Sequence, residues 1–155
     1  MKNGFTKIEV LIFILLIVMV VAMDVAVIWY LSVKNKDIQV FSEVEQIKSG
    51  LEVYLLKNNF YPESNGIINL SDSYSGTEKL CGDGFKKITD NCSQNILKPI
   101  PNQYLAEGNI YRYKRSDDGQ NYQLEFDLIS NFKNLGLKKG KNCANNIQII
   151  SQPCF

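Results

Sequence analysis

The sequence predicts an α+β protein in which one long N-terminal helix, its first half able to span a membrane, packs against a small antiparallel β-sheet head. Three patterns predict this fold class. An apolar segment runs from Ile8 to Leu31, a stripe of apolar residues with the helical period follows it, and two later segments alternate apolar and polar residues. Four cysteines, all beyond the apolar segment, predict two disulfide-closed loops in the head.

The apolar segment contains only two ionisable side chains, Glu9 and Asp24, among its 24 residues. A helix of that length reaches about 36 Å, which is enough to cross a hydrocarbon core. A cleaved secretory signal peptide is the alternative, but its apolar core normally has about 7 to 15 residues. Because hydrophobicity resumes after Asp24 and continues through Trp29 and Tyr30, the pattern favours a membrane span.

A carboxylate near the start of an apolar helix needs a physical reason, because at mid-bilayer it costs about 2.5 kcal/mol or more. If the chain is cut between Gly4 and Phe5, the new α-amino group stands four residues before Glu9, one helical turn away. That amine can neutralise Glu9 of the same chain or of a neighbour. A carboxylate that snorkels to the headgroups, helped by the positive end of the helix dipole, explains Glu9 equally well.

The residues Gly4-Phe5-Thr6-Lys7-Ile8-Glu9-Val10, which follow a short polar leader and lead directly into the span, resemble the class III signal of type IV pilins and the related pseudopilins. The resemblance implies that a prepilin peptidase of the membrane cuts after Gly4, that Phe5 becomes an N-methylated N-terminus, and that Glu9 directs assembly into a homo-oligomeric helical filament. It also implies contact with an inner-membrane assembly machinery, and with membrane lipid before assembly. The resemblance covers about the first 30 residues.

The span departs from the family pattern at two points. Many family members carry a helix-breaking proline or glycine in its second half, where this chain has Val18 and Ala26, so a bend in the helix stays an open question. Asp24 is the second departure. We expect it near the outer membrane face, and the alternative is that it loosens the helix or pairs with a neighbouring subunit.

The predicted organisation is a leader peptide (1–4), a transmembrane and filament-core helix (5–33), its amphipathic continuation (34–59) and a pilin-like globular head (60–155). Gly50, inside the continuation, is expected to allow close approach by a strand. The apolar stripe of the continuation consists of Val40, Val44, Ile47, Leu51 and Leu55, and the opposite face of Glu43, Glu45, Lys48, Glu52 and Lys57.

The head is predicted to begin with a long polar loop over residues 63–109, with room for a short helix or strand, in which Ile67–Leu70 is the clearest apolar run. Residues 110–113 and 122–128 then predict two strands, because their apolar residues follow a period of two. Ser116-Asp117-Asp118-Gly119 between them is a hairpin signal. Residues 147–150 predict a short third strand.

The four cysteines form two groups with equal spacing, Cys81 with Cys92 and Cys143 with Cys154. Three connectivities are possible in an exported domain, and we favour pairing within each group because short loops close readily. A zinc site is disfavoured because the chain has no His and no C-x-x-C motif.

Two further clusters in the head have a functional and an ordinary interpretation. Calcium could bind the loop of Asp117, Asp118, Gln120 and Asn121, although the Asp-Asp-Gly sequence is ordinary hairpin chemistry. DNA could bind a stretch without acidic residues, but without interleaved aromatic residues a solvated loop is favoured; its basic residues are Lys133, Lys138, Lys139 and Lys141.

No motif for catalysis or cofactor binding is found, so we expect a protein that is not an enzyme and has no cofactor. A net charge of +1 gives no general nucleic-acid signature. The expected function is that of a structural subunit of a type IV pilus-like filament, in the membrane first and then on the cell surface. The alternatives are a minor pilin or pseudopilin for DNA uptake, adhesion or type II secretion, and a single-pass membrane protein with an extracellular head.

Overall fold

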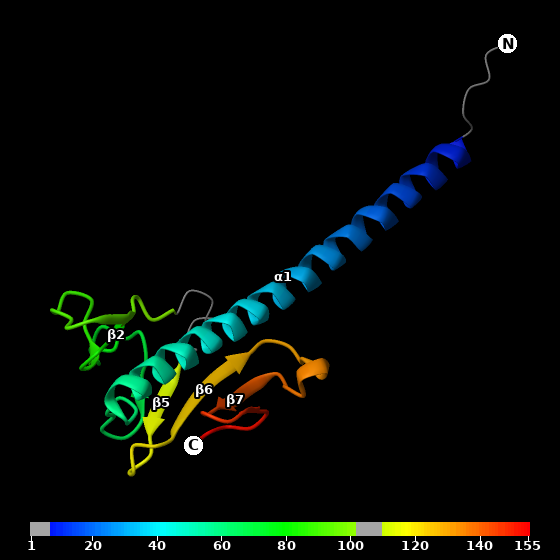
Figure 1. The fold of residues 1–155 in the computed structure, drawn as a ribbon. Coiled ribbons are helices and arrows are strands. Elements are labelled where there is room, and N and C mark those ends of the chain that lie inside the picture. Colours follow the sequence, from blue (N-terminus) through cyan, green and yellow to red (C-terminus); the bar gives the residue numbers. More distant parts are fainter. Residues whose placement is uncertain (1–6, 102–109) are drawn as a thin grey trace. The chain divides into compact units, whose positions relative to one another are not determined.

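A computed structural model of the chain describes residues 7–101 and 110–155. The chain divides into two compact units, Met1–Asn35 and Lys36–Phe155. The helix α1 (Lys7–Asn58) begins in the first unit and ends in the second, and it is α-helical throughout, without a break at Val18 or Ala26. One long helix combined with antiparallel sheets confirms the predicted α+β class (Figure 1).

In the second unit, the apolar stripe of α1 forms one wall of the core. Val40, Val44, Ile47 and Leu51 are buried as predicted, whereas Leu55 is only half-buried and Tyr54 takes the buried position at that turn. The helix stops where Asn59 adopts the left-handed conformation (φ 64°) and its N–H donates to the Leu55 carbonyl at 2.7 Å.

The larger sheet is antiparallel, with five strands in the order β1-β5-β6-β7-β8. Three of them, β5, β6 and β7, are labelled in Figure 1. The hairpin predicted from the two-residue period is present as β5 and β6, and alternate residues of β6, from Tyr122 to Leu128, point into the core that they share with α1. The strands are β1 (Ile68–Asn69), β5 (Arg112–Arg115), β6 (Tyr122–Leu128), β7 (Gly140–Ala144) and β8 (Ile149–Ile150), and a 3-10 helix η1 (Lys133–Leu135) precedes β7.

The expected third strand at 147–150 is present as β8, but it pairs with β7, a strand that the sequence did not indicate. β7 has the sequence Gly-Lys-Asn-Cys-Ala, which shows no apolar alternation. It pairs with β6 over five positions, from Leu124↔Ala144 to Leu128↔Gly140, so backbone pairing rather than side-chain pattern defines this strand.

The region expected to be a long loop contains a second antiparallel sheet in the order β3-β2-β4. Its strands are β2 (Lys79–Cys81), β3 (Gly84–Lys86) and β4 (Asn95–Leu97). Strands of three residues are too short to show a period of two, which is why the pattern of the sequence did not reveal them. The sheet packs on α1 at Gly50, where an added Cβ would lie 3.4 Å from Leu97 Cβ and 3.7 Å from Leu80 Cδ2.

Two carboxylates of α1 are buried against the larger sheet and its loops. Glu43 was expected on the exposed face, but it is only 5% exposed and accepts a hydrogen bond of 2.7 Å from the Tyr111 hydroxyl. The prediction for Glu43 was wrong because its position borders the apolar stripe and its partner is distant in sequence. Asp37 is fully buried and accepts hydrogen bonds from the backbone of Ile129 and from Ser130.

Candidate assembly segment and disulfide-closed loops

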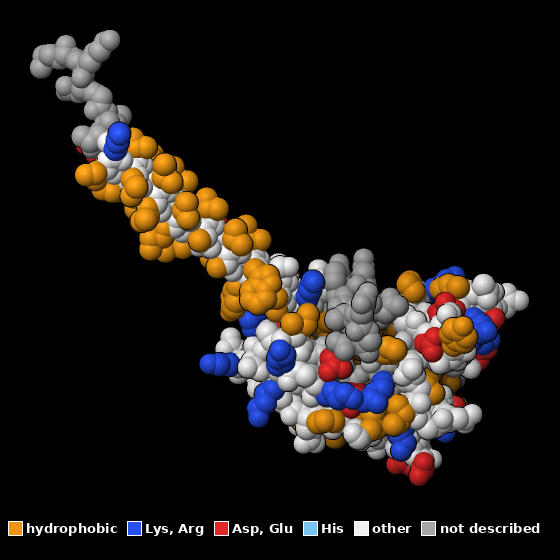
Figure 2. Space-filling model, turned by 180° about the vertical axis from the view of Figure 1, so that it is seen from behind, with side chains coloured by type: hydrophobic (Ala, Val, Ile, Leu, Met, Phe, Trp, Pro, Cys, Tyr) orange, Lys and Arg blue, Asp and Glu red, His pale blue; other side chains and the backbone are white. Residues whose placement is uncertain are grey.

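The apolar part of α1 exposes its side chains on every side. Large side chains from Ile8 to Leu31 are about half to three quarters exposed, and the most apolar window of the helix has no buried residue. Figure 2 shows hydrophobic side chains covering this part of the helix. An apolar helix without a polar face requires an apolar environment. Its length and composition are compatible with a membrane anchor or a signal sequence.

Glu9 lies in the first turn of α1, and its side chain is exposed among apolar neighbours such as Val10 and Phe13. A carboxylate at this end of a helix is favoured by the partial positive charge of the free N–H groups. The predicted cleavage site, Gly4-Phe5, and the predicted N-methylation of Phe5 lie outside the described residues. These assignments therefore stay predictions. Asp24 is exposed on the same helix.

The first disulfide joins Cys81 and Cys92, with the two Cα atoms 5.5 Å apart, and the second joins Cys143 and Cys154, with the Cα atoms 5.1 Å apart. Both predicted pairings are confirmed. Structural disulfides form and persist in oxidising compartments, so they suggest an extracytoplasmic location for the head.

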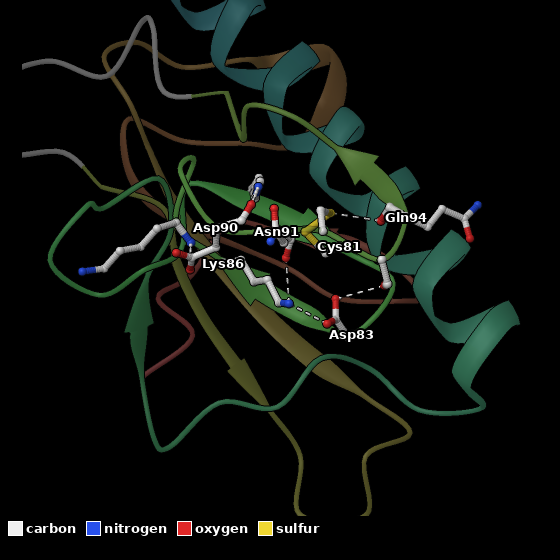
Figure 3. A network of polar contacts seen from close by, with 10 residues as sticks. Cys81, Asp83, Lys86, Asp90, Asn91 and Gln94 are labelled. Atoms are coloured by element: carbon white, nitrogen blue, oxygen red, sulfur yellow. Dashed lines mark hydrogen bonds and ion pairs between the residues drawn. A yellow bond between two sulfur atoms is a disulfide. The ribbon is translucent and has the colours of Figure 1, made fainter.

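Polar contacts reinforce the loop closed by the first disulfide (Figure 3). Lys86 Nζ lies 2.6 Å from Asp83 Oδ2 and donates to the Asn91 carbonyl at 3.0 Å. The Ser93 hydroxyl donates to the other Asp83 oxygen at 3.1 Å. The hydrogen bond from Lys86, together with that from Ser93, lowers the pKa of Asp83. The loop thus keeps a defined conformation through side-chain contacts as well as through its disulfide.

Lys79 supports the same loop from inside and was not singled out by the sequence. This β2 side chain is 2% exposed, and its Nζ donates to the carbonyls of Ile88 at 3.3 Å and of Asp90 at 2.5 Å. A buried ammonium is costly unless its protons have acceptors, and the loop carbonyls supply them. Lys79 therefore has a structural role in the loop.

The second disulfide lies beside a buried carboxylate on the face of β6 that points away from α1. Glu125, 1% exposed, forms ion pairs with Arg112 on β5 and with Lys141 on β7, the latter at 3.1 Å. Its other oxygen accepts the Cys154 N–H at 3.1 Å, and the Arg112 guanidinium lies 5.6 Å from the centre of the Phe155 ring. Glu125 therefore joins three strands to the C-terminal segment.

The loop weighed as a calcium site closes the β5–β6 hairpin. Asp118 Oδ1 accepts hydrogen bonds from the Ser116 hydroxyl and from the Gln120 N–H, and the Gln120 side chain donates to the Asn59 carbonyl at 2.9 Å. The first of these contacts, followed by the second, lowers the pKa of Asp118. Within residues 7–101 and 110–155, no group of three or more Asp, Glu, Cys or His side chains is placed to hold a metal ion.

The four lysines weighed as a DNA-binding stretch are all exposed, but they differ in their partners. Lys141 forms an ion pair with Glu125 at 3.1 Å, while Lys133, Lys138 and Lys139 are exposed in the connection between β6 and β7. The DNA-binding alternative therefore depends on three lysines rather than four.

A cavity of about 610 Å³ in the second unit is lined by the end of α1 and by the β2–β3 turn. Its walls include Tyr54 and the carboxylates of Glu63 and Asp83. Burial, followed by these two carboxylates, raises the pKa of Tyr54. Glu63 is paired with Arg115 at 3.5 Å and Asp83 with Lys86, so both carboxylates already have cationic partners.

No protein-family model, curated protein or solved structure matches this chain. The architecture itself is pilin-like, because a long apolar N-terminal helix is combined with antiparallel sheets that pack on its later part.

Proposed function

We propose that the chain is a structural subunit of a type IV pilus-like filament, which assembles through its N-terminal helix after cleavage between Gly4 and Phe5. The observation that carries this proposal is the exposure of apolar side chains on every side of α1 from Ile8 to Leu31. A single such helix is stable in a lipid bilayer, and many copies packed side by side can replace the lipid. The role is structural rather than catalytic.

Glu9 gives the packing of copies its specificity in this proposal. Once the leader is removed, the α-amino group of Phe5 in one subunit and the Glu9 carboxylate of a neighbour compensate each other in a low-dielectric core. Removing one member of such a pair is costly, because it leaves the other charge buried without a counter-charge. The head contributes a rigid, disulfide-closed domain for the outside of the filament.

The test is filament yield from cells that carry the matching assembly machinery and express the full chain. We expect Glu9→Ala to reduce sheared filaments strongly while the chain still accumulates in the membrane. Glu9→Asp should give an intermediate yield, because the charge is kept and the reach is shorter. Asp24→Ala is the matched control, since it removes the other carboxylate of the same apolar segment, and it should leave the yield unchanged.

Filaments counted by electron microscopy decide the outcome. Wild-type yield from the Glu9→Ala chain would remove the assembly role and leave Glu9 as a snorkelling carboxylate. An equal loss from Glu9→Ala and Asp24→Ala would show that the loss is not specific to Glu9, either because Asp24 also pairs with a neighbouring subunit or because removal of any carboxylate alters the membrane helix.

A further inference from the structure

The connection between β6 and β7 contains a small lobe with a fixed shape. Phe132 and Leu137 form a β-bridge, with N–H to carbonyl distances of 2.9 and 3.1 Å in the two directions. Between them the chain makes η1 and turns at Gly136, which adopts a left-handed φ of 68°. Leu137 is buried and Phe132 packs against the core, so these two side chains anchor the lobe.

The lobe presents one apolar side chain to the solvent. Leu135, at the end of η1, is 52% exposed although both residues of the bridge point inwards. Leu135 is therefore exposed on a loop whose conformation is fixed by the β-bridge and the two anchoring side chains. We name residues 132–139 the η1 lobe.

The charged residues that flank Leu135 in the sequence are of one sign. From Leu128 to Phe155 the sequence has four Lys and no Asp or Glu side chain. Three of the four, Lys133, Lys138 and Lys139, belong to the η1 lobe and are exposed. The salt bridges among the described residues include none of these three. An exposed leucine among lysines has the chemistry of a contact with an anionic lipid surface.

The position of the lobe close to the predicted span also favours contact with the lipid surface. Asp37 of α1 holds the residues just before the lobe, because its carboxylate accepts the N–H groups of Ile129 at 2.7 Å and of Ser130 at 2.8 Å. Asp37 follows Val33, the end of the predicted span, by four residues. Four residues cover at most about 14 Å even when fully extended. The base of the lobe is therefore tethered close to the end of the span, whatever the orientation of the head.

We propose that the η1 lobe docks on the anionic headgroups of the membrane before the subunit assembles, with Leu135 inserted at the interface and the three lysines over lipid phosphates. This inference depends on the membrane-anchored state in the proposed function. Docking holds the head against the bilayer while the subunit waits, and the contact is lost when the subunit leaves the membrane.

The experiment places a tryptophan at the lobe of the full chain reconstituted in vesicles. Trp29 is the single tryptophan of the chain, so Trp29→Phe gives a silent background into which Leu135→Trp is introduced. Ile147→Trp in the same background is the matched control. Ile147 is 81% exposed and follows Ala144, which lies at the opposite end of β7 from Gly140 and the lobe.

The quenching of tryptophan fluorescence is compared between vesicles with brominated phosphatidylglycerol and vesicles with brominated phosphatidylcholine. We expect several-fold stronger quenching of the Leu135→Trp chain in the anionic vesicles, a marked loss of that quenching at high salt, and little quenching of the Ile147→Trp chain in either lipid. Circular dichroism and intact disulfides establish that both chains are folded.

Lysine variants distinguish binding through the η1 lobe from a general electrostatic attraction between the chain and anionic lipid. Lys133→Gln, Lys138→Gln and Lys139→Gln together should abolish most of the lobe's quenching. Three Lys→Gln changes at exposed lysines outside the lobe should leave this quenching largely unchanged; these are Lys87, Lys98 and Lys114. An equal loss of quenching in both triple variants would overturn the proposal, because binding would then depend on the total charge of the head and not on the lobe.

Quenching of Trp29 in the native chain distinguishes a failure of lobe docking from a failure of the membrane anchor on which the proposal depends. Strong quenching of native Trp29 by both lipids without quenching of the Leu135→Trp chain would overturn lobe docking and leave the membrane anchor intact. Unquenched Trp29 would overturn both. Salt-sensitive binding of a short DNA duplex through the same three lysines, with an unquenched Leu135→Trp chain, would assign the lobe to nucleic acid instead.

Discussion

Ser130 donates both its backbone N–H, at 2.8 Å, and its hydroxyl, at 2.5 Å, to one carboxylate oxygen of Asp37, which lies 93 positions earlier in the chain. The other oxygen accepts the N–H of Ile129 at 2.7 Å. Asp37 is fully buried, so these three donors replace the water that the carboxylate loses. This contact joins α1 to the end of β6.

Replacing Asp37 should therefore destabilise the second unit. Asp37→Ala leaves buried N–H groups without an acceptor, and we expect a loss of about 3 kcal/mol in the free energy of unfolding. Asp117→Ala, at an exposed carboxylate in the β5–β6 turn, is the control and should change stability by less than about 0.5 kcal/mol. Denaturant unfolding of the detergent-solubilised chain measures both, and similar values for the two variants would contradict the prediction.

Five buried tyrosines should make the head unstable in alkaline solution: Tyr54, Tyr61, Tyr111, Tyr113 and Tyr122. Burial raises the pKa of Tyr111, Tyr113 and Tyr122 far above the ordinary value of 10.0, and for Tyr111 the hydrogen bond to Glu43 adds to the effect. Below the unfolded pKa of about 10 all five are protonated in both states, so their contribution to stability is complete there. Above it the unfolded chain releases protons that the folded chain keeps, and each tyrosine lowers stability by about 1.4 kcal/mol per pH unit.

Alkaline titration, monitored by circular dichroism and by tyrosinate absorbance, tests this linkage. The two signals should change together above about pH 10. The double variant Tyr111→Phe, Glu43→Gln removes one of the five titrating groups without leaving an unpaired buried carboxylate, and the slope of stability against pH should fall by about one fifth. An unchanged slope would mean that Tyr111 does not contribute to the linkage.

Gly50 should tolerate one methyl group and nothing larger. A Cβ there would meet Leu97 Cβ at 3.4 Å and Leu80 Cδ2 at 3.7 Å, which is ordinary van der Waals contact. Gly50→Ala should therefore stabilise the helix by up to about 1 kcal/mol, because alanine loses less backbone entropy. Gly50→Leu should destabilise by about 1 to 3 kcal/mol through overpacking against the second sheet. Thermal unfolding compares the two, and destabilisation by both would show that the sheet cannot move even slightly.

Processing of the N-terminus is a separate prediction of the filament proposal. The mature chain should begin at an N-methylated Phe5, because the residues around Gly4 resemble a prepilin cleavage site. Intact-mass measurement of protein extracted from membranes checks this directly. Gly4→Ala gives the matched comparison, since the added methyl group alters only the residue before the cut. A mass that retains Met1 in the unsubstituted chain would favour a plain single-pass membrane protein.

The sequence alone determined the features that depend on local pattern. The apolar segment after Ile8, the helical stripe through Leu51 and the hairpin that contains β6 each have enough residues to display a period. The cysteine pairing was also accessible, because each partner is the nearest cysteine along the chain and short loops close at low entropic cost.

Only the tertiary structure decided where the polar groups of α1 go. Glu43 and Asp37 find their partners, Tyr111 and Ser130, 68 and 93 positions away, and no local pattern encodes such a pairing. The second sheet depends in the same way on distant contacts, because its three-residue strands are too short for periodicity and become strands by pairing with one another beside Gly50. Periodicity reports which face of an element is buried, whereas a buried charge is stable only when the folded chain brings donors to it.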